Sequence, residues 1–263
     1  MQIDLTGKVA LVTGGGRGIG QAVSLMLAEL GARIALCGRT AETLETTAEA
    51  IRAHGVEAWP IVADVSNLSE LEAFVETAAR QAGRIDVLVN NAVSSLHAPF
   101  AEQTDDTWRH HLDVKLMAYI RGCRLVVPHM QAAGGGRIVN IGGMTARIVA
   151  PIRITNGVVN AGVSNFTKQL SAQVGEDNIT VNCVHPGFTA TDRMLAGTRR
   201  RAEDSGVSEA VEIERMVSTI PMGRLVEPED IARAVVFFCS PLAAMVTGQS
   251  MAVDGGSGES INY

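Results

Sequence analysis

The residues best suited to chemistry form a glycine-rich turn near the N-terminus. The apolar run Val9–Val12 is typical of a buried strand, and glycines follow at positions 14, 15, 16, 18 and 20. From Ile19 onward, apolar residues recur at three- and four-residue spacing, which is typical of a helix. A helix that begins at a glycine turn offers free backbone N–H groups to phosphate oxygens. The stretch therefore predicts a dinucleotide site, with a purely structural turn as the alternative. The predicted phosphate-side residues are Gly14, Gly16, Arg17, Gly18, Ile19 and Gly20.

The end of the second predicted strand indicates which dinucleotide is preferred. A carboxylate at this place usually holds the adenosine ribose of NAD(H). This chain instead has Cys37, Gly38 and Arg39, with no acidic residue. Because guanidinium groups pair well with phosphates, Arg39 and Arg17 can both recognise a 2′-phosphate. We therefore expect NADP(H) rather than NAD(H); two solvated surface arginines are the alternative.

Composition narrows the class of function. The chain has 263 residues, and its 22 basic and 28 acidic residues give a net charge of −6, which argues against nucleic acid and anionic membrane partners. No apolar run reaches the roughly 18 residues of a membrane span, and the start MQIDLTGK lacks a secretory signal, so a cytoplasmic location is expected. The four cysteines and six histidines lack metal-ligand spacing, so we expect buried thiols and no metal site.

The remaining chain alternates strands with helices. Repeated strand–helix units predict an α/β fold, a Rossmann-like doubly wound parallel sheet of about seven strands with helices on both faces. We expect one domain, 1–263. Its segment 189–222 is expected to form a lid on the substrate side through Met194, Leu195, Met216 and Met222, with a packed loop core as the alternative. The predicted strands are Val9–Val12, Arg33–Cys37, Glu57–Val62, Val87–Val89, Arg137–Ile141, Thr180–Val184 and Ser250–Val253. After the helix that starts at Ile19, the predicted helices are Ala41–His54, Ser69–Ala82, Asp105–Ala132, Asn156–Val174, Glu209–Thr219 and Pro228–Phe238.

From end to end, the chain resembles the short-chain dehydrogenase/reductase family. The matching motifs are Thr13-Gly14-x3-Gly18-Ile19-Gly20, Asp64-Val65, Asn90-Asn91-Ala92 (with Val93 where glycine is usual), the fifth strand Gly136–Ile141, Pro186-Gly187 with Thr191, and the C-terminal Thr247-Gly248-Gln249 and Val253–Gly256. The resemblance implies an oxidoreductase that acts on a carbonyl or alcohol substrate. It also implies cofactor contacts from Asp64, Val65, Asn91, Ala92, Asn160, Pro186, Gly187, Thr189 and Thr191.

The resemblance fails at the reaction centre. The family uses an asparagine, a serine, a tyrosine and a lysine, and the matching positions here are Lys115, Gly143, Asn156 and Asn160. An asparagine amide does not titrate in the useful range, so Asn156 cannot exchange a proton as tyrosine does. No Tyr-x3-Lys sequence occurs elsewhere in the chain. The usual tyrosine-dependent carbonyl reduction is therefore not expected.

Lys115 is the candidate catalytic residue. In the family, the asparagine at this position lies close to the lysine through a water, so the ammonium of Lys115 could extend toward the place of Asn160. There it would hold the cofactor ribose or polarise a substrate oxygen. The alternative is that Lys115 extends into solvent or pairs with Asp113 or a neighbouring acidic residue.

Three functions remain open from the sequence. The first is an NADP(H)-dependent oxidoreductase with a rebuilt proton-transfer site. The second is a non-redox lyase or isomerase, and the third is an inactive nucleotide-binding or structural partner of an active relative. The resemblance also implies a homo-oligomer, a tetramer or dimer, assembled through the two long helices. Weaker site candidates are Ser94, Ser95, His97, Thr145, Arg147, Arg153 and Thr155.

Overall fold

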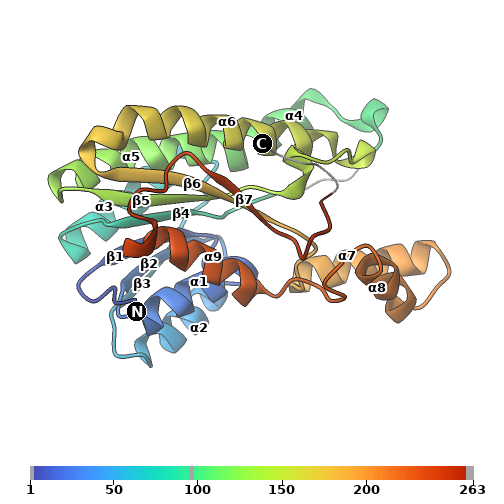
Figure 1. Ribbon diagram of the computed structural model, residues 1–263, viewed down its shortest axis with the longest axis horizontal. Coiled ribbons are helices and arrows are strands. Elements are labelled where there is room, and N and C mark those ends of the chain that lie inside the picture. Colours follow the sequence, from blue (N-terminus) through green and yellow to red (C-terminus); the bar gives the residue numbers. More distant parts are fainter. Residues whose placement is uncertain (1–2, 95–97, 259–263) are drawn as a thin grey trace.

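A single parallel sheet organises the structure. The computed structural model describes residues 3–94 and 98–258. Seven strands pair in the order β3-β2-β1-β4-β5-β6-β7, and every pairing is parallel (Figure 1). This confirms the predicted doubly wound sheet. The strands are β1 (Val9–Thr13), β2 (Arg33–Gly38), β3 (Ala58–Val62), β4 (Val87–Asn90), β5 (Gly136–Ile141), β6 (Ile179–Pro186) and β7 (Ser250–Val253).

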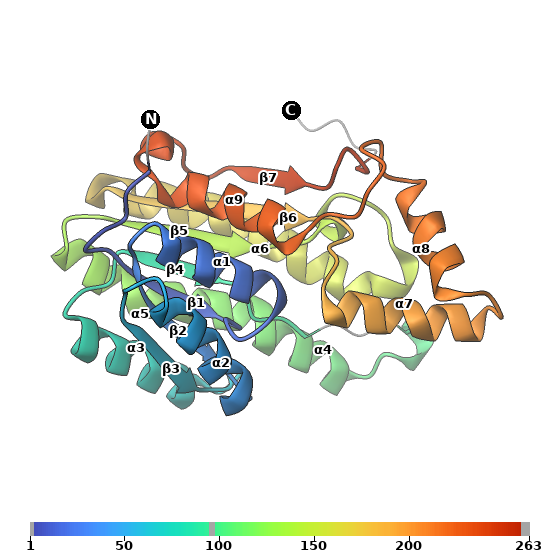
Figure 2. The same cartoon turned by 90° about the horizontal axis from the view of Figure 1, so that it is seen from below.

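Helices cover both faces of the sheet. α1, α2 and α9 lie on one face, while α3, α5 and α6 lie on the other (Figure 1). The carboxyl ends of the strands point toward α4, α7 and α8 (Figure 2). The helices are α1 (Gly18–Glu29), α2 (Ala41–Arg52), α3 (Leu68–Ala82), α4 (Asp105–His111), α5 (Ala118–Ala132), α6 (Ile154–Val174), α7 (Asp192–Asp204), α8 (Glu209–Val217) and α9 (Pro228–Cys239).

Strand β1 shows why the sheet is buried on both faces. All five of its residues are buried. Ala10 and Val12 belong to the hydrophobic cluster beneath α1 and α9. Val9 and Leu11 belong to the cluster beneath α3 and α5. Successive side chains of a strand point to opposite faces, so an uninterrupted apolar run fills both cores. The four cysteines, expected as buried thiols, are indeed buried and free.

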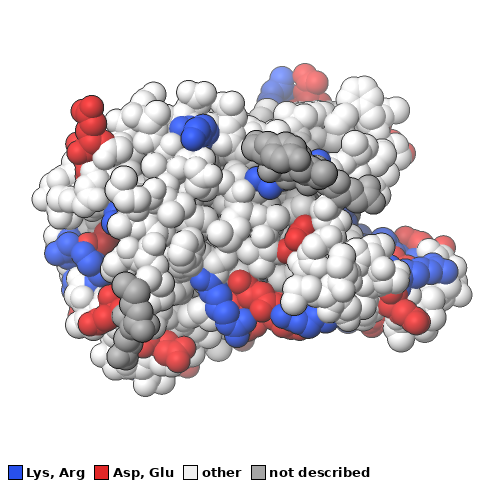
Figure 3. Space-filling view, viewed as in Figure 1, with Lys and Arg blue, Asp and Glu red and all other residues white. Residues whose placement is uncertain are grey.

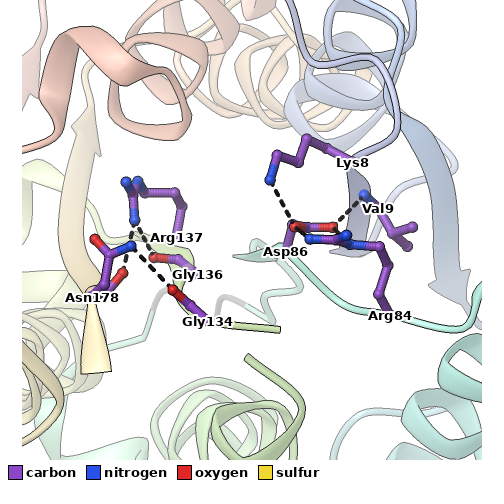
Figure 4. Close-up of polar contacts among 8 residues, drawn as sticks. All are labelled: Lys8, Val9, Arg84, Asp86, Gly134, Gly136, Arg137 and Asn178. Atoms are coloured by element: carbon purple, nitrogen blue, oxygen red, sulfur yellow. Dashed lines mark hydrogen bonds and ion pairs between the residues drawn. The ribbon is translucent and has the colours of Figure 1, made fainter. Parts of the chain in front are cut away.

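Polar contacts hold the amino edge of the sheet, opposite the expected site (Figure 4). The carboxylate of Asp86, just before β4, accepts hydrogen bonds from Lys8 Nζ at 3.1 Å and Arg84 Nη2 at 2.6 Å. Burial would raise the pKa of Asp86, but these hydrogen bonds outweigh it and hold the pKa below its usual value. Arg137 Nη1 donates to the carbonyl of Asn178 at 3.0 Å and so joins the starts of β5 and β6.

Two features differ from the expected elements. The long helix predicted over Asp105–Ala132 is interrupted by a π-helical turn, Leu112–Met117, between α4 and α5. Helix α7 was not predicted, because its sequence is highly polar and its only buried residues are Thr198 and Ala202. The other boundaries of the predicted elements differ by at most two residues.

The surface is unevenly charged. On the face shown in Figure 3, few charged residues lie over the upper part of the molecule, whereas many lie along its lower edge and at the end that carries α7 and α8. None of the helices in the described part of the chain is both long and apolar enough to cross a membrane. Assembly into a dimer or tetramer stays a prediction.

Candidate functional site

The glycine turn forms a cradle that only glycine fits. Gly14 and Gly18 have φ angles of +66° and +53°, a region that side chains disfavour. A Cβ atom on Gly20 would collide with the carbonyl oxygen of Gly14, and one on Gly18 would lie 3.1 Å from Thr191 Cγ2. No side chain caps the start of α1, and its first turn contains no acidic residue. The geometry therefore fits a phosphate group at this helix N-terminus.

The end of β4 is fastened to this turn. The amide nitrogen of the Asn91 side chain donates to the carbonyls of Thr13 and Gly14 at 3.0 and 3.2 Å. The hydroxyl of Thr13 accepts from the backbone N–H groups of Asn91 and Ala92 at 2.9 and 3.1 Å. The structure thus gives Asn91 a role in holding the turn, next to the switch point between β1 and β4 where α/β ligands bind.

The adenosine side of the predicted site brings Arg39 and Asp64 together. Arg39 Nη1 lies 4.0 Å from Asp64 Oδ2, and 70% of the Arg39 side chain is exposed. Asp64 Oδ1 accepts from the backbone N–H and the hydroxyl of Ser66 at 2.9 and 2.7 Å, while Val65 is buried. An exposed ion pair at this distance is weak, so Arg39 is free to pair with a phosphate.

Lys115 is buried at the carboxyl edge of the sheet. Its side chain comes from the π-helical turn, and Nζ donates to the carbonyl of Gly142 at 2.8 Å, just after β5. The residue is only 6% exposed, so it does not extend into solvent. Among the described residues no ion pair joins Lys115 to Asp113, whose carboxylate pairs with Arg121 at 3.3 Å instead.

Burial changes the proton affinity of Lys115. Desolvation disfavours the ammonium and lowers the pKa of Lys115 to about 7. The positive charge of Arg193 lowers it further, while Cys183 acts in the opposite direction. Both protonation states are therefore populated near neutral pH, which is the condition a general acid or base requires.

Gly143 and Asn160 fit each other closely. Asn160 is 5% exposed, and its amide nitrogen donates to the hydroxyl of Thr145 at 2.8 Å. A Cβ atom on Gly143 would lie 2.6 Å from that nitrogen. The Asn160 carbonyl oxygen is buried and has no hydrogen-bond partner in the described part of the chain. Since buried polar atoms are usually paired, this orphaned acceptor fits a ligand hydroxyl, such as that of a cofactor ribose.

Substitution of Gly143 by serine tests this fit. We expect Gly143→Ser alone to lower the free energy of unfolding by about 1 kcal/mol or more, because the Asn160 amide must move and release Thr145. Asn160→Ala should relieve the collision. The double variant should therefore lose less free energy of unfolding than the two single variants lose together. Urea unfolding of the four proteins measures the coupling, and strictly additive effects would contradict the close fit.

His185 supports the same corner of the site. Its Nδ1 lies 3.0 Å from both the backbone nitrogen and the carbonyl oxygen of Gly143, and Nε2 lies 3.2 Å from the Ser164 hydroxyl. Burial lowers the pKa of His185 to about 4, so the ring is neutral at pH 7. The histidine therefore positions the chain after β5 and does not compete with Lys115 as a proton donor at neutral pH.

The loop after β6 lies beside the glycine turn. A Cβ atom on Gly187, which follows Pro186, would lie 2.7 Å from Asp254 Cα, so glycine permits the close approach of these backbones. Thr189 Oγ1 donates to the Gly187 carbonyl at 3.1 Å, and Thr191 caps α7 by accepting from Met194 N–H. This part of the predicted cofactor side is thus assembled at one edge of the sheet.

The weaker candidates are dispersed. Thr155 is buried 2.8 Å from His111 Nδ1, and Arg147 Nη2 donates to the Ser250 carbonyl at 2.7 Å. Ser94 Oγ lies 3.2 Å from His110 Nε2. Asn156 is half-buried in the first turn of α6, one residue after Thr155. The predicted candidates Ser95 and His97 lie outside the described residues.

Sequence comparison decides the family. Residues 14–258 match the family model described as enoyl-(acyl carrier protein) reductase. The 3-oxoacyl-(acyl-carrier-protein) reductase FabG of Pseudomonas aeruginosa is 37% identical over 254 residues, which cover 97% of this chain and 98% of the relative. The chain belongs to the short-chain dehydrogenase/reductase family. The resemblance of its motifs is thereby confirmed.

Solved structures of this family share the fold over its whole length. L-Sorbose reductase from Gluconobacter frateurii, complexed with NADPH and L-sorbose, has a TM-score of 0.96 at 31% identity and covers 99% of this chain and 100% of its own. An NAD⁺-bound xylitol dehydrogenase has a TM-score of 0.90 at 28% identity, with coverage of 96% and 99%. Members of this short-chain dehydrogenase/reductase family therefore use either nicotinamide dinucleotide.

Proposed function

We propose that the chain is an NADP(H)-dependent oxidoreductase of carbonyl or alcohol substrates in which Lys115 has taken over proton transfer. The observation that carries this proposal is the buried Lys115 ammonium, 2.8 Å from the Gly142 carbonyl. A buried charge of this kind is costly to maintain, and perturbed groups of this kind cluster at functional sites. Lys115, Gly143, Asn156 and Asn160 then stand in place of the usual family tetrad.

The residues of the cleft fit a nicotinamide dinucleotide. The N–H groups at the start of α1 would hold phosphate oxygens, and Arg17 and Arg39 would pair with a 2′-phosphate. The orphaned oxygen of Asn160 would accept a hydrogen bond from a ribose hydroxyl. When bound, the nicotinamide supplies or accepts the hydride. The relatives named above are a 3-oxoacyl reductase and an L-sorbose reductase, so a carbonyl compound is the first substrate class to test.

The proton chemistry falls to Lys115. In the reducing direction, its protonated amine would donate to the substrate oxygen, and in the oxidising direction its neutral form would accept that proton. The Thr145 hydroxyl accepts from Asn160, which leaves its own proton available to bind the substrate oxygen in place of the missing serine. We expect the 189–222 segment, with α7 and α8, to close this side of the site.

The cofactor preference is tested by the affinity for the two reduced dinucleotides. We expect the wild-type chain to bind NADPH at least about tenfold more tightly than NADH, because the arginines gain charge-assisted hydrogen bonds to the 2′-phosphate. Arg39→Gln should weaken NADPH binding by about tenfold and leave NADH unchanged. Cofactor fluorescence on titration measures both constants. Equal affinities in the wild type would mean that the arginines are only solvated surface residues.

A further inference from the structure

Arg193 connects two sides of the predicted cofactor cleft. It is the second residue of α7, two positions after the capping residue Thr191. Its Nη1 donates to the carbonyl oxygen of Val93 at 3.2 Å. Val93 follows Asn91 and Ala92, the residues that fasten β4 to the glycine turn. The guanidinium therefore reaches from α7 to the carboxyl end of β4.

The surroundings of Arg193 are rich in positive charge. Arg193 is an exposed residue, but partial desolvation of its guanidinium and the positive charge of Arg17 lower the pKa of Arg193. The positive charge of Arg193 in turn lowers the pKa of Lys115. Within the described residues, no carboxylate lies at ion-pair distance from Arg17 or Arg193. Arg193 thus interacts electrostatically with two other cations, Arg17 and Lys115, and neither arginine has an acidic partner among the described residues, which favours an anionic ligand beside Arg193.

The glycine turn places a phosphate site beside this arginine. The start of α7 touches the turn, because a Cβ atom on Gly18 would lie 3.1 Å from Thr191 Cγ2. We infer that Arg193 binds the diphosphate bridge of the dinucleotide, exchanging the Val93 carbonyl for phosphate oxygens. A guanidinium binds phosphate through two charge-assisted hydrogen bonds, which are stronger than a single bond to a neutral carbonyl. The inference rests on the proposed nicotinamide cofactor and gives α7 a direct contact with it.

Arg39 and Arg193 then have separate roles in binding the dinucleotide. Arg39 would recognise the 2′-phosphate, which only NADP(H) carries, whereas Arg193 would recognise the diphosphate, which both dinucleotides carry. Arg200, exposed on the same helix α7, provides a matched control with the same loss of charge. Arg193→Gln should therefore affect NADPH and NADH alike, and Arg39→Gln only NADPH.

The experiment measures the dissociation constants of NADPH and NADH for wild type, Arg193→Gln, Arg39→Gln and Arg200→Gln by cofactor fluorescence, with inorganic pyrophosphate as a competitor. We expect Arg193→Gln to weaken the binding of NADPH and of NADH by a similar factor of about ten, and to make pyrophosphate a weaker competitor. Arg200→Gln should leave both affinities and the competition by pyrophosphate unchanged. Thermal unfolding checks that each variant is folded.

Three outcomes would overturn the inference. If Arg193→Gln binds both dinucleotides like wild type, Arg193 does not contact the diphosphate, although the proposed cofactor stands. If Arg193→Gln weakens NADPH alone, the arginine reads the 2′-phosphate instead. If the wild-type chain binds neither dinucleotide, the proposed function fails together with this role of Arg193.

Discussion

Lys115→Met is expected to stabilise the fold by a few kcal/mol at pH 7 and below. Burial lowers the pKa of Lys115 from its usual 10.5 to about 7, and a pKa difference of one between the folded and unfolded chain corresponds to about 1.4 kcal/mol. The unfolded chain therefore binds a proton that the folded chain releases between about pH 7 and pH 10. Burial of Lys115 therefore lowers the free energy of unfolding by about 4 kcal/mol at pH 7. This loss has its full size below pH 7 and disappears as the pH rises toward 10.5, the pKa of Lys115 in the unfolded chain. Loss of the bond to the Gly142 carbonyl offsets part of the gain, by about 1 kcal/mol.

Urea unfolding from pH 6 to pH 10 measures this effect. The stability of the wild type should rise with pH between 7 and 10 more steeply than that of Lys115→Met. Lys168→Met, at an exposed position, is the control and should show the wild-type slope. If Lys115→Met lowers stability at every pH with an unchanged slope, Lys115 is a structural cation with an ordinary pKa. A stabilising substitution would indicate that the chain retains this lysine for function at a cost in stability.

Gly20→Ala is expected to weaken NADPH binding by at least about 100-fold. The new Cβ atom would meet the Gly14 carbonyl and lie 2.6 Å from the Asn91 amide nitrogen, so the turn and its fastening to β4 must both shift. Loss of two hydrogen bonds, together with misplacement of the phosphate-binding N–H groups, accounts for an effect of this size.

Gly175→Ala is the matched control for Gly20→Ala. Gly175 has an ordinary helical φ of −62°, and a Cβ atom there would meet nothing within 4 Å. Fluorescence titration gives the affinities, and circular dichroism verifies that both variants are folded. If a folded Gly20→Ala protein binds NADPH within about twofold of wild type, the turn is not the phosphate cradle.

The sheet and the glycine turn were predictable because their signals are local. The run Val9–Val12 is apolar throughout and β1 is buried on both faces, while the glycines at 14 and 18 adopt the positive φ angles that explain their presence. Alternation of strands and helices was sufficient for the parallel sheet, since right-handed crossovers leave few arrangements. The order of the seven strands, with the switch between β1 and β4, was not predicted, because the handedness of the crossovers does not fix where the chain reverses direction along the sheet.

The reaction centre was less predictable because it depends on contacts between distant residues. The π-helical turn that carries Lys115 inserts residues into an otherwise regular helical pattern, and apolar spacing does not reveal it. The mutual fit of Gly143 and Asn160 joins the end of β5 to α6, and neither residue alone indicates it. Arg193 was missed because α7 is highly polar and offers few apolar residues on which helix prediction can rely.

The pH dependence of NADPH-dependent carbonyl reduction tests the central claim most directly. A panel of ketones and aldehydes is offered to the NADPH-saturated wild type and to Lys115→Met, with Lys168→Met as control. We expect wild-type turnover that falls as pH rises through about 7, because the donating ammonium is lost, and a decrease of about 100-fold or more in Lys115→Met. Equal rates in wild type and Lys115→Met would contradict the role of Lys115. Tight NADPH binding with no turnover of any carbonyl would contradict the proposed oxidoreductase and favour an inactive nucleotide-binding partner.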